Sequence, residues 1–192
     1  METRGKIKEN IIEESCHQAC FIIQMLRIAG LMCICFFDSG ANNQIVQLDF
    51  AKHAGFKQLS NRTSTVSVAG DGCVKVEGLW QVYLGYDKKG KLYELNCIGM
   101  SQVTSAFTEY SMEGLHQAAL DYDKKHGSHF QNEPLPERVG GGCVNLLVGI
   151  KAGELMPQLL HNLPGGLCVF RMKLADAWGS RIAFAGPTAE FT

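Results

Sequence analysis

The segment Asp38-Ser39-Gly40-Ala41 contains residue types that could hydrolyse a peptide bond. Hydrolysis without a metal or a covalent intermediate needs one group that takes a proton from water and another that protonates the carbonyl oxygen. Two carboxyl groups that share one proton can do both, because like charges this close cannot both form and the apparent pKa values of the pair separate. The pattern predicts that Asp38 is one carboxyl of such a pair, with Ser39 and Gly40 as its catalytic loop partners.

The residues around Asp38 are suited to hold it rigidly. An apolar strand is predicted over 31–37 and delivers Asp38 at its end. Gly40 permits a close backbone approach, and the Ser39 hydroxyl can lock the turn by hydrogen bonding. Ala41 and Asn42 follow and are predicted to contact a substrate. The alternative interpretation is an ordinary polar turn, because Asp, Ser, Gly and Asn all favour turns.

Two further motifs follow in the order that an aspartic protease requires, and they weigh against an ordinary turn. Ala69-Gly70-Asp71-Gly72, about 30 residues after Asp38, predicts a hairpin tip at the place where an aspartic protease carries the flap that covers its substrate. Leu147-Val148-Gly149, about 110 residues after Asp38, belongs to an apolar run that predicts a buried strand. It resembles the apolar-apolar-Gly motif that supports the active-site loop from behind in retropepsins.

With three motifs in order, the chain resembles the retropepsin-like aspartic proteases of Pao/BEL-type LTR retrotransposons, or a cellular gene derived from one. The segments that carry the resemblance are Phe36-Phe37-Asp38-Ser39-Gly40-Ala41, Val144-Asn145-Leu146-Leu147-Val148-Gly149, Leu163-Pro164-Gly165-Gly166-Leu167, Trp178-Gly179-Ser180 and Ala185-Gly186-Pro187. The similarity covers roughly 19–187 and is weakest over 101–140. One departure is Lys151, which stands where retropepsins often have Asp or Asn.

The resemblance implies a mainly β fold: a retropepsin-like closed β-barrel (the acid protease fold) with a flap hairpin, a short C-terminal helix and a helical insertion. It also implies catalysis at a homodimer interface. Only Asp38, of seven aspartates, lies in an Asp-Ser/Thr-Gly context, so the second carboxylate is expected from a second copy in a C2 dimer. The expected substrate is an extended polypeptide, such as a polyprotein. The alternative is a domesticated, non-catalytic module that dimerises or binds peptides.

The amino-acid composition limits the classes of protein to which the chain can belong. The chain has 192 residues, 46% hydrophobic and 19% charged, which is typical of one globular domain. The net charge of −1 gives no reason to expect a nucleic-acid or membrane-surface partner. Eight cysteines without a preceding secretory segment indicate free thiols and an intracellular, cytoplasmic setting. Gln24, Arg27 and Gly30 interrupt the apolar run 19–37, which favours two strands over a membrane span.

Other chemistry is less well supported, and neither a metal nor another cofactor is expected. The spacing of Cys33 and Cys35, and of Cys16-His17 with Cys20, fits no zinc motif, and solvated loop positions account better for His126 and His129. No cysteine has the signature of a Cys–His protease. Gly140-Gly141-Gly142 lacks the Gly-Lys-[Ser/Thr] ending of a phosphate loop and predicts a flexible hinge.

The elements that must position these residues follow from periodicity and turn signals. The predicted organisation is a flexible lead-in at 1–18, one domain at 19–187 that contains the 101–140 insertion, and a tail at 188–192. Strands are expected at 19–28, 31–37, 63–69, 73–86, 91–100, 144–150, 167–174 and 181–184. A strand end and short helix are expected within 44–56, and helices within 112–122 and 153–161.

Overall fold

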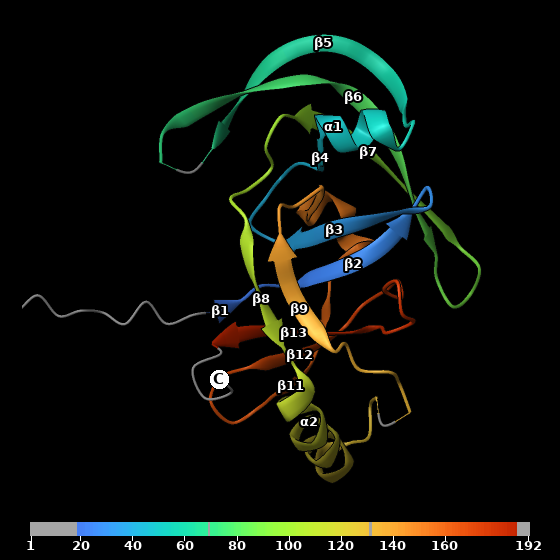
Figure 1. Ribbon diagram of the computed structural model, residues 1–192, viewed down its shortest axis with the longest axis vertical. Helices are drawn as coiled ribbons and strands as arrows, with labels where there is room; N and C mark the ends of the chain where they lie inside the picture. The colour runs from blue at the N-terminus through green and yellow to red at the C-terminus, as the bar shows by residue number, and fades with distance from the viewer. Residues whose placement is uncertain (1–18, 69, 131, 188–192) are drawn as a thin grey trace, which may run out of the picture.

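The computed structural model describes residues 19–187 except 69 and 131 (Figure 1). The described chain is mainly β, as the sequence predicts. The predicted lead-in 1–18, with Cys16 and His17, and the tail 188–192 lie outside the described residues. No helix in the described part is long and apolar enough to cross a bilayer.

The larger sheet has seven strands in the order β2-β3-β10-β4-β7-β6-β5. Strands β10 and β3 are parallel, as are β4 and β7, and the other neighbours are antiparallel. Each expected strand has a counterpart, but the 19–28 strand is interrupted after Cys20 and the 63–69 strand begins at Lys57. The strands expected at 144–150 and 167–174 extend only over 146–149 and 168–171. The bounds are β2 (Ile23–Ile28), β3 (Leu31–Asp38), β4 (Ile45–Gln47), β5 (Lys57–Val68), β6 (Gly72–Tyr86), β7 (Leu92–Met100) and β10 (Leu146–Gly149).

This sheet is open, in contrast to the closed barrel that was expected. Within the described residues, β2 pairs only with β3 and β5 only with β6. Closure would require these two edge strands to pair. Almost every residue of β5 is exposed, so this strand has no buried face to pack into a barrel. Figure 1 shows β5 and β6 arching together over α1 (Leu48–His53) at the top of the molecule.

A smaller sheet and the insertion form the lower half of Figure 1. The smaller sheet has the order β1-β13-β12-β11, with bounds β1 (Ala19–Cys20), β11 (Gln158–Asn162), β12 (Cys168–Arg171) and β13 (Ile182–Pro187). The insertion contains a two-stranded ribbon, β8 (Phe107–Ser111) with β9 (Arg138–Gly142), and the predicted helix, α2 (Glu113–His126). Gly140–Gly142 form part of β9 and pair with β8. The hinge prediction was wrong because ladder hydrogen bonds hold these glycines.

The predicted C-terminal helix differs from the observed one. A 3₁₀ helix, η1 (Ile150–Leu155), begins directly after Gly149, and the chain is already extended at Met156. Pro157 cannot donate a helical hydrogen bond and disfavours a helical residue before it. The segment after Pro157, expected as part of the helix, is strand β11 paired with β12.

The described part contains two hydrophobic cores. The first is formed mainly by residues of the larger sheet and includes Val46, Val82 and Val148. The second includes Leu115 of α2 and Phe184 of β13 and joins the insertion to the smaller sheet. Alternate residues Cys33, Cys35 and Phe37 of β3 are buried in the first core. Since side chains alternate along a strand, Asp38 faces away from that core.

The seven cysteines within the described residues are all free thiols. Three of them lie in the first core, where burial raises the pKa of Cys97 to about 12 and also raises the pKa of Cys33 and Cys35. These thiols are therefore uncharged at neutral pH and pack as small apolar side chains.

Candidate active site

Asp38 is the last residue of β3 and is partly exposed. The Gly40 N–H donates to Asp38 Oδ1 over 2.8 Å, and the Ala41 N–H donates to the Asp38 carbonyl over 3.1 Å. A Cβ atom on Gly40 would lie 3.1 Å from Asp38 Oδ1. The turn thus holds the carboxyl through its own backbone, and one carboxylate oxygen is left without a bond to Gly40.

Strand β10 supports this loop from behind. Gly149 lies opposite Asp38 in the parallel β3–β10 register, and Leu147 and Val148 precede it as buried residues. The Ile150 N–H donates to the Ala41 carbonyl over 2.8 Å. A Cβ atom on Gly149 would lie 2.5 Å from the Ala41 carbonyl oxygen, so only glycine fits there without a shift of the loop. The three predicted support residues and the Asp38 loop are therefore brought together.

Asn145, Gln44 and Gln47 also hold the site, although the sequence did not single out their side chains. Asn145 Oδ1 accepts the Ile34 N–H over 2.9 Å, and Asn145 Nδ2 donates to Gln47 Oε1 over 3.0 Å, which ties β3 to β4. Gln44 Oε1 accepts the Gly149 N–H over 2.5 Å. The available signal was the position of polar amides next to apolar strand residues, because buried amides need partners.

The remaining loop residues are accessible. Ser39 and Asn42 are exposed and Ala41 is partly buried. No hydrogen bond joins the Ser39 hydroxyl to another described residue, so its loop-locking role stays a prediction. Lys151 Nζ lies 3.4 Å from Asn43 Oδ1, which places a cation beside the loop at the position where the sequence departs from retropepsins.

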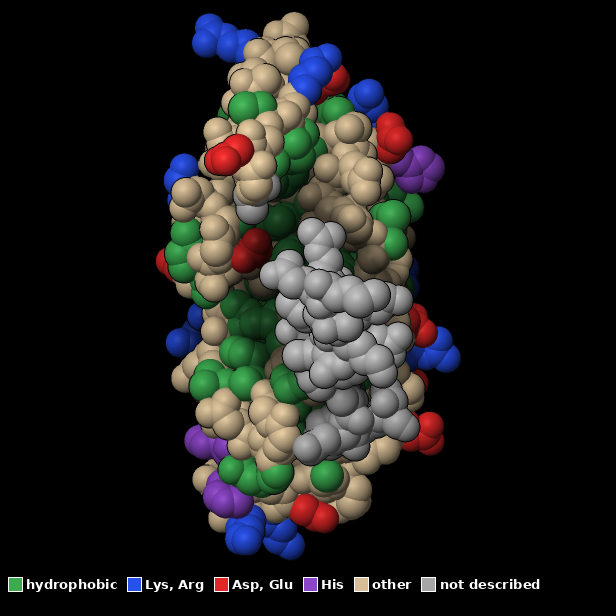
Figure 2. All heavy atoms as spheres, turned by 90° about the vertical axis from the view of Figure 1, so that its left-hand side faces the viewer, with side chains coloured by type: hydrophobic (Ala, Val, Ile, Leu, Met, Phe, Trp, Pro, Cys, Tyr) green, Lys and Arg blue, Asp and Glu red, His purple; other side chains and the backbone are tan. Residues whose placement is uncertain are grey.

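The predicted tip residues Gly70, Asp71 and Gly72 lie at the end of the long β5–β6 hairpin, while Ala69 is outside the described residues. Asp71 has φ 59°, a left-handed conformation that makes the turn tight. No hydrogen bond between this tip and the Asp38 loop occurs in the described chain. The tip and the end of β3 both point to the left in Figure 1, and Figure 2, which views that side, shows a hollow with hydrophobic side chains.

In the part of the chain that the structure describes, Asp38 forms no ion pair and no hydrogen bond with another side chain. No group of three or more potential metal ligands is present among the described residues.

No protein-family model matches this sequence, and no curated protein matches it.

An aromatic cluster adjoins the loop on the face of β3 that carries Asp38. Phe36 is two residues before Asp38, so both side chains leave the same face of the strand. The Phe36 ring lies 5.3 Å from that of Phe107 in β8 and 5.9 Å from that of Phe21. The Phe21 and Phe107 rings are 4.9 Å apart, and Phe21 is 46% exposed. The insertion thus contributes an apolar wall beside the candidate site, which the sequence did not predict.

Proposed function

We propose that this chain is one protomer of a homodimeric aspartic endopeptidase of the retropepsin-like, Pao/BEL retrotransposon type, which hydrolyses peptide bonds of a polyprotein. The observation that carries the proposal is the seating of Asp38: its carboxyl accepts the Gly40 N–H, and Gly149 packs directly against the carbonyl of Ala41 in the same loop. A loop held from two sides keeps a reacting carboxyl in fixed geometry, which general acid–base catalysis requires.

The proposed chemistry uses Asp38 from both protomers with one shared proton. The ionised carboxylate takes a proton from water while the water oxygen bonds to the scissile carbonyl carbon. The protonated carboxyl gives its proton to the carbonyl oxygen. When the tetrahedral intermediate collapses, the first carboxyl protonates the departing amine. The second carboxylate takes a proton from one hydroxyl of the intermediate as that hydroxyl becomes the carbonyl of the product acid, which restores the starting state.

The β5–β6 hairpin is the proposed cover for the substrate, with Gly70, Asp71 and Gly72 at its tip. Strand β5 is an edge strand whose residues are almost all exposed, and an extended polypeptide can bond to such an edge along its backbone. Closure over the Asp38 pair would exclude water and strengthen the electrostatic interactions there.

The decisive experiment is a cleavage assay on an extended peptide library with the inhibitor pepstatin. Wild-type protein is expected to cleave, and pepstatin to block cleavage. Asp38→Asn should lower kcat/KM by at least about 10³-fold because the amide cannot transfer the proton. Asp49→Asn, an exposed aspartate in α1, is the matched control and should stay within about twofold. Equal cleavage by wild type and Asp38→Asn would reject the proposal.

The second candidate is a non-catalytic module that dimerises or binds peptides through the same surface. The proximity of Lys151 to Asn43 favours it, because a cation there replaces the Asp or Asn often found in retropepsins. This function predicts that wild type and Asp38→Asn bind an extended peptide with the same Kd and that neither cleaves it.

A further inference from the structure

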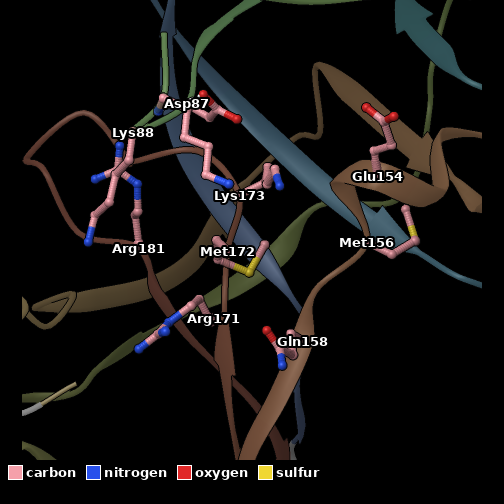
Figure 3. A pocket seen from close by; sticks show the side chains of 10 residues that line it. Asp87, Lys88, Glu154, Met156, Gln158, Arg171, Met172, Lys173 and Arg181 are labelled. Carbon is pink, nitrogen blue, oxygen red and sulfur yellow. Dashed lines mark hydrogen bonds between the residues drawn. The ribbon is translucent and has the colours of Figure 1, made fainter. Parts of the chain in front are cut away.

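A pocket lies at the end of β6 opposite the hairpin tip, and no step of the proposed hydrolysis uses it. It has a volume of about 300 Å³. It is bounded by the β6–β7 turn, by the η1–β11 segment, by the end of β12 with the two residues that follow it, and by Arg181 just before β13. Figure 3 shows Asp87 and Lys88 on one side, Glu154 and Met156 on the other, and Met172 between them. The buried Met172 gives the pocket an apolar floor.

Positive charge is concentrated in this pocket. Two carboxylates line it, Asp87 and Glu154, against five cationic side chains, which leaves a net charge of +3. The whole chain has a net charge of −1, so this concentration is a local feature. Several like charges around one concave site favour the binding of an anion. The five cationic residues are Lys88, Lys89, Arg171, Lys173 and Arg181.

The local carboxylates are already engaged. Asp87 Oδ1 accepts the N–H groups of Lys89 and Lys91 over 2.8 and 2.9 Å. Glu154 forms an ion pair with Lys91, which lies outside the pocket lining, and Lys88 pairs with Glu133 over 2.5 Å. Of the five cationic residues that line the pocket, four form no ion pair with a carboxylate of the described residues: Lys89, Arg171, Lys173 and Arg181.

Arg171 and Arg181 each have an N–H donor that forms no hydrogen bond with another described residue. The Nε atoms of Arg171 and Arg181 are buried and have no hydrogen-bond partner within the described residues. Arg171 Nη2 donates to the carbonyl of His129, which fixes its guanidinium plane. A fixed guanidinium presents a fork of N–H groups that matches the oxygens of a phosphoryl group, and lysine ammonium groups add charge around it.

We propose that this pocket binds a diphosphate group, held by Arg181 and Arg171 with Lys173 and Lys89 neutralising its charge. The pocket volume is at the lower end of the range for small-molecule sites, so it suits a compact polyanion. The same diphosphate chemistry occurs in inorganic pyrophosphate and in nucleoside diphosphates. The site is separate from Asp38, and its occupancy does not depend on peptide hydrolysis.

The test is isothermal titration of the full chain with inorganic pyrophosphate and, in a second arm, with ADP at low ionic strength. Saturable one-to-one binding is expected. Lys173→Gln removes one exposed charge and Arg181→Lys keeps the charge but removes the fork, and each should weaken the Kd by about tenfold. Lys124→Gln, an equal charge change on exposed α2, is the control and should change the Kd by less than about twofold.

The titrations distinguish recognition of the diphosphate, recognition of a nucleotide and general electrostatic attraction. Equal Kd values for pyrophosphate and ADP assign recognition to the diphosphate alone, and tighter ADP binding assigns it to a nucleotide. Unsaturable binding, or equal weakening by the Lys124 control, would show only general attraction and overturn the proposal. Asp38→Asn should bind pyrophosphate like wild type, so a failure of the protease proposal leaves this result unaffected.

Discussion

At the scale of single residues, glycines set the geometry of the Asp38 loop. Gly149 approaches the carbonyl oxygens of Ala41 and Asn43 so closely that a methyl group would lie 2.5 and 2.7 Å from them. These are backbone atoms in a loop that also carries the candidate catalytic carboxyl. A side chain at Gly149 would therefore act on stability and on the position of Asp38 together.

Gly149→Ala is expected to lower the free energy of unfolding by about 1–3 kcal/mol, because backbone atoms must move to admit the methyl group. It should also lower any peptide cleavage further than the loss of folded protein explains. Gly153→Ala is the control, since no atom lies within 4 Å of its added Cβ. Urea unfolding measures both variants. A Gly149→Ala protein as stable as Gly153→Ala would contradict the close approach.

At the scale of elements, a buried aspartate fastens the insertion to the smaller sheet. Asp123, near the end of α2, is fully buried and accepts the N–H groups of His129 and Phe130 over 2.7 and 3.0 Å. His161 Nε2 of β11 donates to the same carboxylate over 2.8 Å. Burial alone would raise the pKa of Asp123, but the hydrogen bonds from His161, Phe130 and His129 outweigh it and the pKa lies below its ordinary value.

Asp123→Asn should lower the free energy of unfolding by about 2–4 kcal/mol, because the amide NH₂ would face N–H donors and the charge-assisted bonds are lost. Asp121→Asn is a matched control in the same helix. Asp121 is exposed, and among the described residues its carboxylate accepts a hydrogen bond only from Gln117, so a change within about 0.5 kcal/mol is expected. Thermal and urea unfolding compare the two proteins, and equal losses would refute a specific anchor at Asp123.

The lowered pKa of Asp123 also predicts a pH dependence of stability. A carboxyl with a lowered pKa in the folded state contributes stability that is present above its unfolded pKa of about 3.9 and is lost as the pH falls through its folded pKa. Wild-type protein should therefore lose more stability than Asp123→Asn as the pH falls below about 4. Urea unfolding at several pH values measures the difference, and parallel curves for the two proteins would contradict the assignment.

The aromatic cluster links the insertion to the candidate site. If Phe107, Phe21 and Phe36 line the substrate path, Phe107→Ala should raise KM for peptides with large apolar side chains by about tenfold, since truncation removes buried apolar contact. Peptides with small side chains should be affected less. Leu92→Ala, at an exposed position of β7 outside the hairpin, is the control. Equal effects on both peptide classes would indicate a structural role for Phe107 instead.

At the scale of the whole molecule, the proposed activity depends on assembly. Each chain supplies one Asp38, so two copies must meet about a two-fold axis to form the carboxyl pair. Specific activity should therefore fall on dilution, in parallel with the dimer fraction measured by sedimentation. A monomer that cleaves peptides at high dilution would exclude the shared site.

Cleavage should also be fastest at mildly acidic pH, because one carboxyl of the pair must hold a proton.

Much of the local structure was predictable from sequence. The apolar run 31–37 and the Gly70-Asp71-Gly72 turn predicted β3 and the hairpin, because apolar runs and turn chemistry are properties of neighbouring residues. The insertion helix followed from its apolar spacing. The terminal helix was misplaced, since pairing of β11 with β12 depends on a strand beyond the next turn.

The sequence by itself determined the residues of the Asp38 turn and the order of the segments that surround it. Only the tertiary structure decided that Gly149 touches the Ala41 carbonyl, that Phe107 reaches Phe36, and that the large sheet stays open. The basic pocket, too, gathers side chains from positions 87 to 181. The reason is physical: turn and strand preferences act over a few residues, whereas these contacts join residues about 70 or more positions apart and depend on how the sheets and the insertion pack.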